Sequence, residues 1–146
     1  MNQKFPYEKP EILPPALQEV LSYWEKLRRG QETIPFSDDI KLSQYPKLEG
    51  ELILLDVFAK PQRHRFSIVG KSVVKAYGKD VAGIFLDELE PGPPFTLIHS
   101  QASAAVEARM PNFYVGESYL RLLLPAWGDG HVSALLGIIG PKMPSM

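Results

Sequence analysis

Apolar residues of the N-terminal third recur every three or four positions, the spacing of one helix face. The positions that share this spacing are Leu17, Val20, Leu21, Trp24 and Leu27. Pro15 suits the first position of a helix, and Gly30 suits the left-handed residue that often follows its last turn. The pattern predicts a helix over residues 15–30.

Further along the chain, the apolar pattern changes to that of strands. A near-continuous apolar run at residues 50–58 and a return run at 63–70 predict two strands of a hairpin. Side chains alternate between the two faces of a strand, so His64, Phe66 and Ile68 are expected on one face.

Residues 112–127 and 131–139 are also strand-like, and turn residues at Gly116–Glu117 and 128–130 divide them into three strands. Between the two sets of strands lie a short helical segment at 71–78 and a longer one at 95–110. Two strands, a helical crossing and three strands predict the α+β class. The expected architecture is one five-stranded antiparallel sheet with helices over one face and an N-terminal capping helix.

The chain has 146 residues, the size of one ordinary domain. We expect a loose segment at residues 1–14, a single domain at 15–140 that includes the helix 15–30, and a tail at 141–146. Cysteine is absent, which excludes disulfides, thiol nucleophiles and cysteine-bound metals.

The net charge of −1 argues against a general binder of nucleic acid or membranes. Residues 41–80 nevertheless carry eight Lys/Arg against four Asp/Glu, a local charge of +4, interpreted as a solvated basic face. No run has the length of a signal peptide core or a membrane span, so a cytoplasmic protein is expected.

Several motifs together resemble the small bacterial PAS-type sensor family. They are YWEKLRRGQETIP, FSIVGKSVVKAYGKDVAG, LDEL and YLRLLLP followed by DG and LLG. Their order and spacing also match, over about residues 20–140. The chain departs from the family pattern at Ala82, where a threonine is usual, at His64, where an aromatic residue is common, and in the segment EPGPP.

The resemblance implies a PAS-like fold whose helices enclose a small-molecule pocket, and a role in sensing or dimerisation. We therefore expect a regulatory module that binds a small, largely apolar ligand and signals by contact with an unidentified output protein. The expected ligand-binding residues are Phe66, Ile68, Val73, Val74, Tyr77, Ile84, Phe85, Ile98, His99, Tyr119 and Arg121. A homodimer is also expected, through Leu17, Leu21, Tyr23 and Trp24 of the first helix, with capping of its own domain as the alternative role of that helix.

Two polar residues carry most of the possible chemistry. His99 could bind a haem iron or a ligand, or be a hydrogen-bonded core residue; because no second ligand lies at metal spacing, no metal ligand is predicted and the cofactor is left open. Arg121 is an anion anchor if it faces the pocket and a surface residue if it faces outward.

No nucleophile motif accompanies the three histidines, so an enzyme is not expected. The adjacent acids Asp87 and Glu88 are interpreted as a solvated helix end. The alternative functions are a ligand-free protein-interaction module on the same fold and, third, a small enzyme acting on a carboxylate held by Arg121.

Overall fold

The computed structural model describes residues 9–30 and 33–141. The expected loose segment at residues 1–14 and the expected tail at residues 141–146 lie largely outside the described residues. The elements are α1 (Pro15–Leu27), η1 (Ser37–Asp39), η2 (Leu42–Gln44), η3 (Pro46–Glu51), β1 (Leu52–Ala59), β2 (Gln62–Val69), α2 (Lys71–Tyr77), η4 (Leu86–Glu88), α3 (Ile98–Ala108), β3 (Asn112–Val115), β4 (Tyr119–Gly128) and β5 (His131–Pro141).

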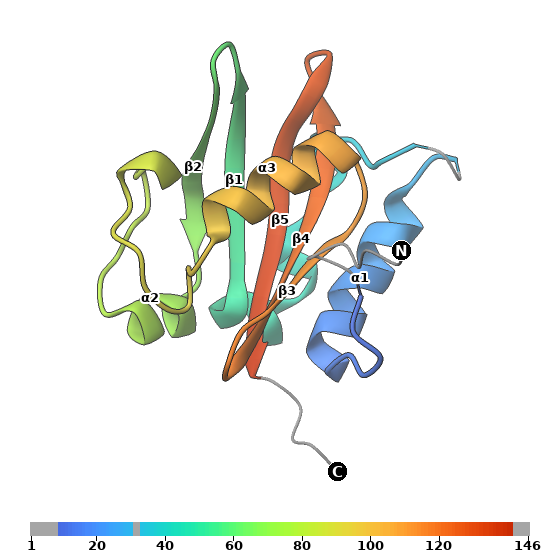
Figure 1. Cartoon of the computed structure of the whole chain (residues 1–146). Coiled ribbons are helices and arrows are strands. Elements are labelled where there is room, and N and C mark those ends of the chain that lie inside the picture. The colour runs from blue at the N-terminus through green and yellow to red at the C-terminus, as the bar shows by residue number, and fades with distance from the viewer. Residues whose placement is uncertain (1–8, 31–32, 142–146) are drawn as a thin grey trace, which may run out of the picture.

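The strands form one antiparallel sheet in the order β2-β1-β5-β4-β3. The predicted hairpin β1–β2 and the hairpin β4–β5 lie in different parts of the sheet and are joined where β1 pairs with β5 (Figure 1). The α+β class and the five antiparallel strands are thus confirmed.

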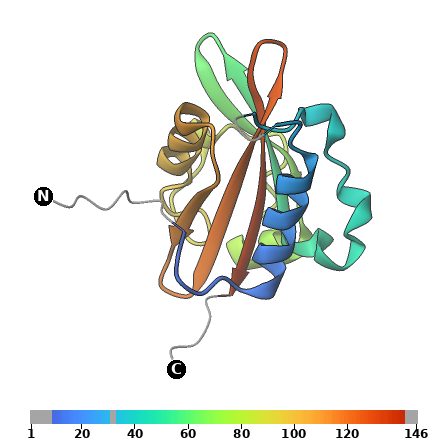
Figure 2. The same ribbon diagram turned by 90° about the vertical axis from the view of Figure 1, so that its right-hand side faces the viewer.

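Helices cover both faces of this sheet, which corrects the expectation of helices over one face. α2, η4 and α3 lie on one face, and α1 lies on the other, so the strands are seen between two helical layers in Figure 2. The reason is the composition of β4 and β5, whose residues are buried at successive positions rather than at alternate ones. Strands that are apolar on both sides need a layer on each side.

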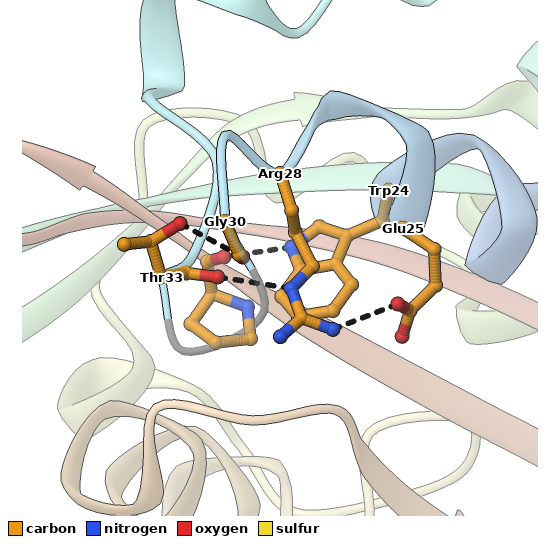
Figure 3. A network of polar contacts seen from close by, with 6 residues as sticks. Trp24, Glu25, Arg28, Gly30 and Thr33 are labelled. Carbon is orange, nitrogen blue, oxygen red and sulfur yellow. Dashed lines mark hydrogen bonds and ion pairs between the residues drawn. The ribbon is translucent and has the colours of Figure 1, made fainter.

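The helix α1 buries the predicted apolar stripe against β4 and β5 but ends earlier than expected. Its last residue is Leu27, and Arg28 has an extended backbone, so Gly30 is not the left-handed stop. Figure 3 shows how this end is held. Arg28 lies over the ring of Trp24, 5.5 Å from its centroid, and donates to Glu25 at 2.8 Å and to the carbonyl of Thr33 at 2.9 Å.

Trp24 fixes α1 to an edge of the sheet. Its indole N–H donates to the carbonyl of Pro125 at 2.8 Å. The short β3 pairs with β4 only as far as Leu123, so Pro125 lies at an edge, which is where a strand accepts proline. The buried indole of α1 thus takes the place of a missing strand partner.

A β-bulge in β2 overturns the predicted face of Ile68. Leu54 pairs with Ile68 and Leu55 pairs with Phe66, so Ser67 is the extra residue. One extra residue moves every following side chain to the opposite face. Ile68 therefore lies on the α1 side of the sheet with Leu54, away from His64 and Phe66, and is 42% exposed.

The longest helix of the other layer, α3, starts at Ile98 and not at residue 95. Leu97 has a left-handed backbone with φ of 57°, which separates the preceding turn from the helix. On this helix Ile98, Ala102 and Ala105 are buried, whereas His99 is exposed. Among residues 9–30 and 33–141, no helix has both the length and the apolar character to cross a membrane.

Candidate functional site

The structure does not bring the expected ligand-binding residues into a single site. Phe66, Val73, Ile98 and Arg121 are buried, whereas His99 and Ile68 are exposed. The partly buried members are Val74, Tyr77, Ile84, Phe85 and Tyr119. Most of the set lies on the α3 side of the sheet, but it divides between a packed core, two grooves and the molecular surface.

The core on the α3 side of the sheet contains three of the chain's own aromatic rings, from β2, α2 and the segment before α3. The centroid of Phe95 lies 4.9 Å from that of Phe66 and 4.9 Å from that of Tyr77. These rings pack against Val73 and Ile98 in the same cluster of buried residues. Phe66 and Ile98 are therefore core residues, and access for a ligand lies at the margins of this core.

Arg121 faces the α3 side but is not an anchor for an external anion. Its side chain is completely buried, and it donates to Gln101 at 2.6 Å and to the backbone carbonyls of Pro94 and Thr96, each at 2.7 Å. The guanidinium also lies 4.5 Å from the ring centroid of Tyr114. These bonds hold the segment before α3 against β4, so Arg121 is a structural residue.

Two grooves flank α2, and both are bordered by Pro93. The larger, of about 470 Å³, is called the Lys79 groove and is lined by Tyr77, Lys79, Val81, Ile84, Glu88, Leu89, Glu90, Pro91, Gly92 and Pro93. The second, of about 390 Å³, is called the Tyr119 groove and is lined by Glu51, Ser72, Val73, Ala76, Pro93, Pro94, Ser118, Tyr119, Ile139, Gly140 and Pro141. Four of the expected ligand residues thus line grooves, two in each.

The Lys79 groove carries charges of both signs. Lys79 contributes an ammonium group, and Glu88 and Glu90 contribute carboxylates. One wall is fixed by Tyr77, whose hydroxyl donates to the carbonyl of Glu90 at 2.7 Å. A groove of this composition suits a polar ligand better than the apolar one expected from the sequence.

The Tyr119 groove is mainly apolar. Val73 and Ala76 of α2 form one wall, and Ile139 lies at the end of β5. The hydroxyl oxygen of Tyr119 is buried and has no hydrogen-bond partner among the described residues. A buried hydroxyl usually has such a partner, so this wall offers an unused donor and acceptor beneath an apolar surface.

Phe85 does not line either groove. Its ring lies 5.7 Å from that of Phe58, and the guanidinium of Arg63 stacks on it at 3.7 Å. Arg63 also binds both oxygens of Asp87, at 2.8 and 2.9 Å, and this bond lowers the pKa of Asp87 from its usual value. The acid is thus one half of an exposed ion pair, which agrees with the interpretation of a solvated helix end.

His64 and His99 form a pair that sequence reasoning missed. Their ring centroids are 5.5 Å apart and their planes are nearly perpendicular, at 86°. His64 is 1% exposed, and neither of its ring nitrogens has a hydrogen-bond partner among the described residues. Burial, and to a smaller extent His99, lowers the pKa of His64 to about 4, so this imidazole is neutral at ordinary pH.

The expected dimer residues are covered by the chain itself. Leu17, Leu21, Tyr23 and Trp24 are at most 7% exposed and pack against the α1 side of the sheet. A dimer surface made of these four side chains would require α1 to leave the sheet. The packing supports the alternative role of α1, which is to cap its own domain.

Within residues 9–30 and 33–141, no group of three or more histidine or acidic side chains is arranged to hold a metal ion. Comparisons with protein-family models, with curated proteins and with solved structures each found no match to the chain. The function therefore has to be inferred from the geometry described above.

Proposed function

We propose that the chain is a PAS-like regulatory module that binds a small, largely apolar molecule in the Tyr119 groove. The observation that carries this proposal is the groove itself, an apolar hollow of about 390 Å³ at the margin of the α3-side core. Small-molecule sites are typically concave and mostly apolar, with volumes of roughly 300–1,000 Å³ and a few polar groups.

The architecture is also in keeping with the sequence resemblance. One antiparallel sheet of five strands carries two short helical elements and the longer α3 over the same face, the arrangement that the PAS-type motifs imply. The Tyr119 groove lies between α2 and the ends of β4 and β5. A ligand there would contact a helix and the central strands together, so its binding would change how firmly α2 is held.

The walls define the class of ligand. Val73, Ala76 and Ile139 favour an aliphatic or aromatic body, and the unused hydroxyl of Tyr119 favours one polar group on it. That hydroxyl lies beneath the groove surface, so the polar group would meet it after a small movement of the Tyr119 ring. A hydrogen bond of this kind contributes roughly 0.5–1.5 kcal/mol net.

The proposal is tested with apolar fragments that each carry one amide, carboxylate or hydroxyl group. Binding is measured by the rise in melting temperature and by NMR shifts of the Ala76 and Ile139 amides, because a ligand bound only to the folded state at 100 times its Kd stabilises by about 2.7 kcal/mol. Ala76→Trp, which fills the groove from an exposed position, should abolish binding.

A matched pair of variants separates the two grooves. Tyr119→Phe should raise the Kd of a fragment with a polar group by about 2- to 13-fold, the equivalent of one hydrogen bond. Tyr77→Phe, in the Lys79 groove, should leave its binding unchanged. Fragments whose binding survives Ala76→Trp, or a panel that never perturbs these amides, would refute the site.

We further propose that the signal leaves through a protein contact, with a homodimer as the first partner to examine. Because Leu17, Leu21, Tyr23 and Trp24 are buried, that contact has to use other surfaces. Light scattering at several protein concentrations, with and without a bound fragment, tests this part. A monomer at every concentration would exclude the homodimer and leave a different output protein as the partner.

A further inference from the structure

We propose that His64 of β2 and His99 of α3 together bind a divalent transition-metal ion. The proposal starts from the unusual state of His64. A neutral imidazole has one donor nitrogen and one acceptor nitrogen, and buried polar groups without partners call for an explanation, of which an ion is one. Both nitrogens of His64 are buried and unpartnered among the described residues, and the ring that faces it is another imidazole.

The separation of the two rings suits a shared metal. With metal–nitrogen bonds of about 2.0–2.1 Å, each ring centroid lies about 3 Å from the ion, and a tetrahedral angle places the two centroids about 5 Å apart. The observed separation is 5.5 Å. The perpendicular rings have to rotate about their side-chain bonds to aim a nitrogen each at the ion, but neither backbone has to move far.

The exposure of the two rings differs in a way that allows an ion to enter. His64 is buried in the core, whereas His99 is exposed on the first turn of α3. His99 can therefore swing outward, admit an ion and close over it. The carboxylate of Asp87 on η4 acts electrostatically on both rings, although Arg63 holds that carboxylate in an ion pair and so reduces its attraction for a cation.

The ligand set defines the class of ion. Imidazole nitrogens suit Cu²⁺, Ni²⁺ and Zn²⁺, with Cu²⁺ bound most strongly, and do not suit Mg²⁺ or Ca²⁺. Because the described residues hold no third ligand at the site, water fills the remaining positions. Such an ion would join α3 directly to β2. Without it, the two elements are connected at this point by the contact between the rings of His64 and His99.

The test titrates the full chain, without a histidine tag, with Ni²⁺ and Zn²⁺ by calorimetry. Wild type should bind one equivalent. His99→Ala removes an exposed side chain and should lower the affinity at least about tenfold, because even loss of a residue that only supports a ligand costs 10- to 100-fold. His64→Phe keeps a ring in the core and should have the same effect, with its fold checked by circular dichroism.

His131→Asn is the matched control. His131 belongs to β5 and contacts the carbonyls of Asp129 and Val57, so its loss should leave the binding unchanged. Cu²⁺ electron paramagnetic resonance should show coupling to two ring nitrogens in wild type and to one in His99→Ala. Absence of stoichiometric binding, unchanged affinity in His99→Ala, or loss of binding in His131→Asn would each overturn the proposal.

Discussion

Replacement of the buried guanidinium of Arg121 should be among the most damaging single changes in this fold. Arg121→Met keeps an unbranched, apolar side chain of similar bulk next to the backbone, although it is shorter than arginine because it lacks the guanidinium group. It removes the donors to Gln101 and to the carbonyls of Pro94 and Thr96, at 2.6, 2.7 and 2.7 Å. The backbone carbonyls that precede α3 then lose their partner inside the protein.

The expected loss follows from these bonds. A hydrogen bond to a charged group contributes roughly 1.5–3 kcal/mol net, so three independent bonds would total about 4–9 kcal/mol. The three bonds share one side chain, so their contributions are not additive. Methionine also carries no charge, so the variant avoids the free-energy cost of burying a guanidinium, which offsets part of the loss. We therefore expect the free energy of unfolding to fall by about 3 kcal/mol, a large part of the 5–15 kcal/mol that is typical of a domain.

Urea unfolding followed by circular dichroism measures this loss. With an m-value of about 1–3 kcal/mol/M, the midpoint should fall by about 1–3 M. Arg109→Met is the matched control, because Arg109 is exposed and stacks on Trp127 at 4.8 Å; an exposed contact of this kind contributes about 0.5–1 kcal/mol. If Arg121→Met lowers the free energy of unfolding no more than this control does, the bonds of Arg121 do not stabilise the fold as described.

Three further predictions concern stability. In the presence of a chelator, the free energy of unfolding should fall by up to about 3 kcal/mol as the pH is lowered from 7 to 4. The reason is that His64 takes up its proton near pH 6.5 in the unfolded chain and only near pH 4 in the folded chain. Urea titrations at several pH values should show this loss in wild type and not in His64→Phe. Trp24→Phe should cost about 1–3 kcal/mol by leaving the carbonyl of Pro125 without its indole donor, and an unchanged melting temperature would contradict this. Gly70→Ala should cost at least about 1–3 kcal/mol, since its Cβ would lie 2.5 Å from the carbonyl oxygen of Glu49; equal midpoints in urea would show that the backbone yields freely.

The candidate site was only partly accessible to sequence reasoning. The resemblance named Val73 and Tyr119 among the expected ligand residues, and both line the Tyr119 groove. It could not show that the donors of Arg121 are used by the turn before α3, because that turn depends on Leu97 adopting a left-handed backbone. The pairing of His64 with His99 was also hidden, since residues so far apart in sequence meet only in the folded chain, where the first turn of α3 comes next to β2.

The local elements could be predicted from the sequence, because their signals are local. The 3.6-residue period of α1, the strand-like runs of β1, β4 and β5, and the glycine that ends α2 are physical preferences of short segments. Gly78 does adopt the left-handed backbone expected of a helix end, with φ of 92°. The apolar runs of β4 and β5 were also visible in the sequence, but the prediction of helices over one face did not draw the consequence that both faces of these strands need a cover.

Which faces meet depends on long-range packing and could not be predicted from the sequence. The bulge at Ser67 moves Ile68 from the α3 side to the α1 side. The alternation of apolar and polar residues does not reveal such an extra residue, because a bulge is defined only by how the strand pairs with its neighbour. In the same way, the side chains of α1 were recognisable as apolar, but the choice between a dimer and the chain's own sheet was made by packing. Faces are encoded by sequence spacing, whereas partners are selected by the free energy of burying one particular pair of surfaces.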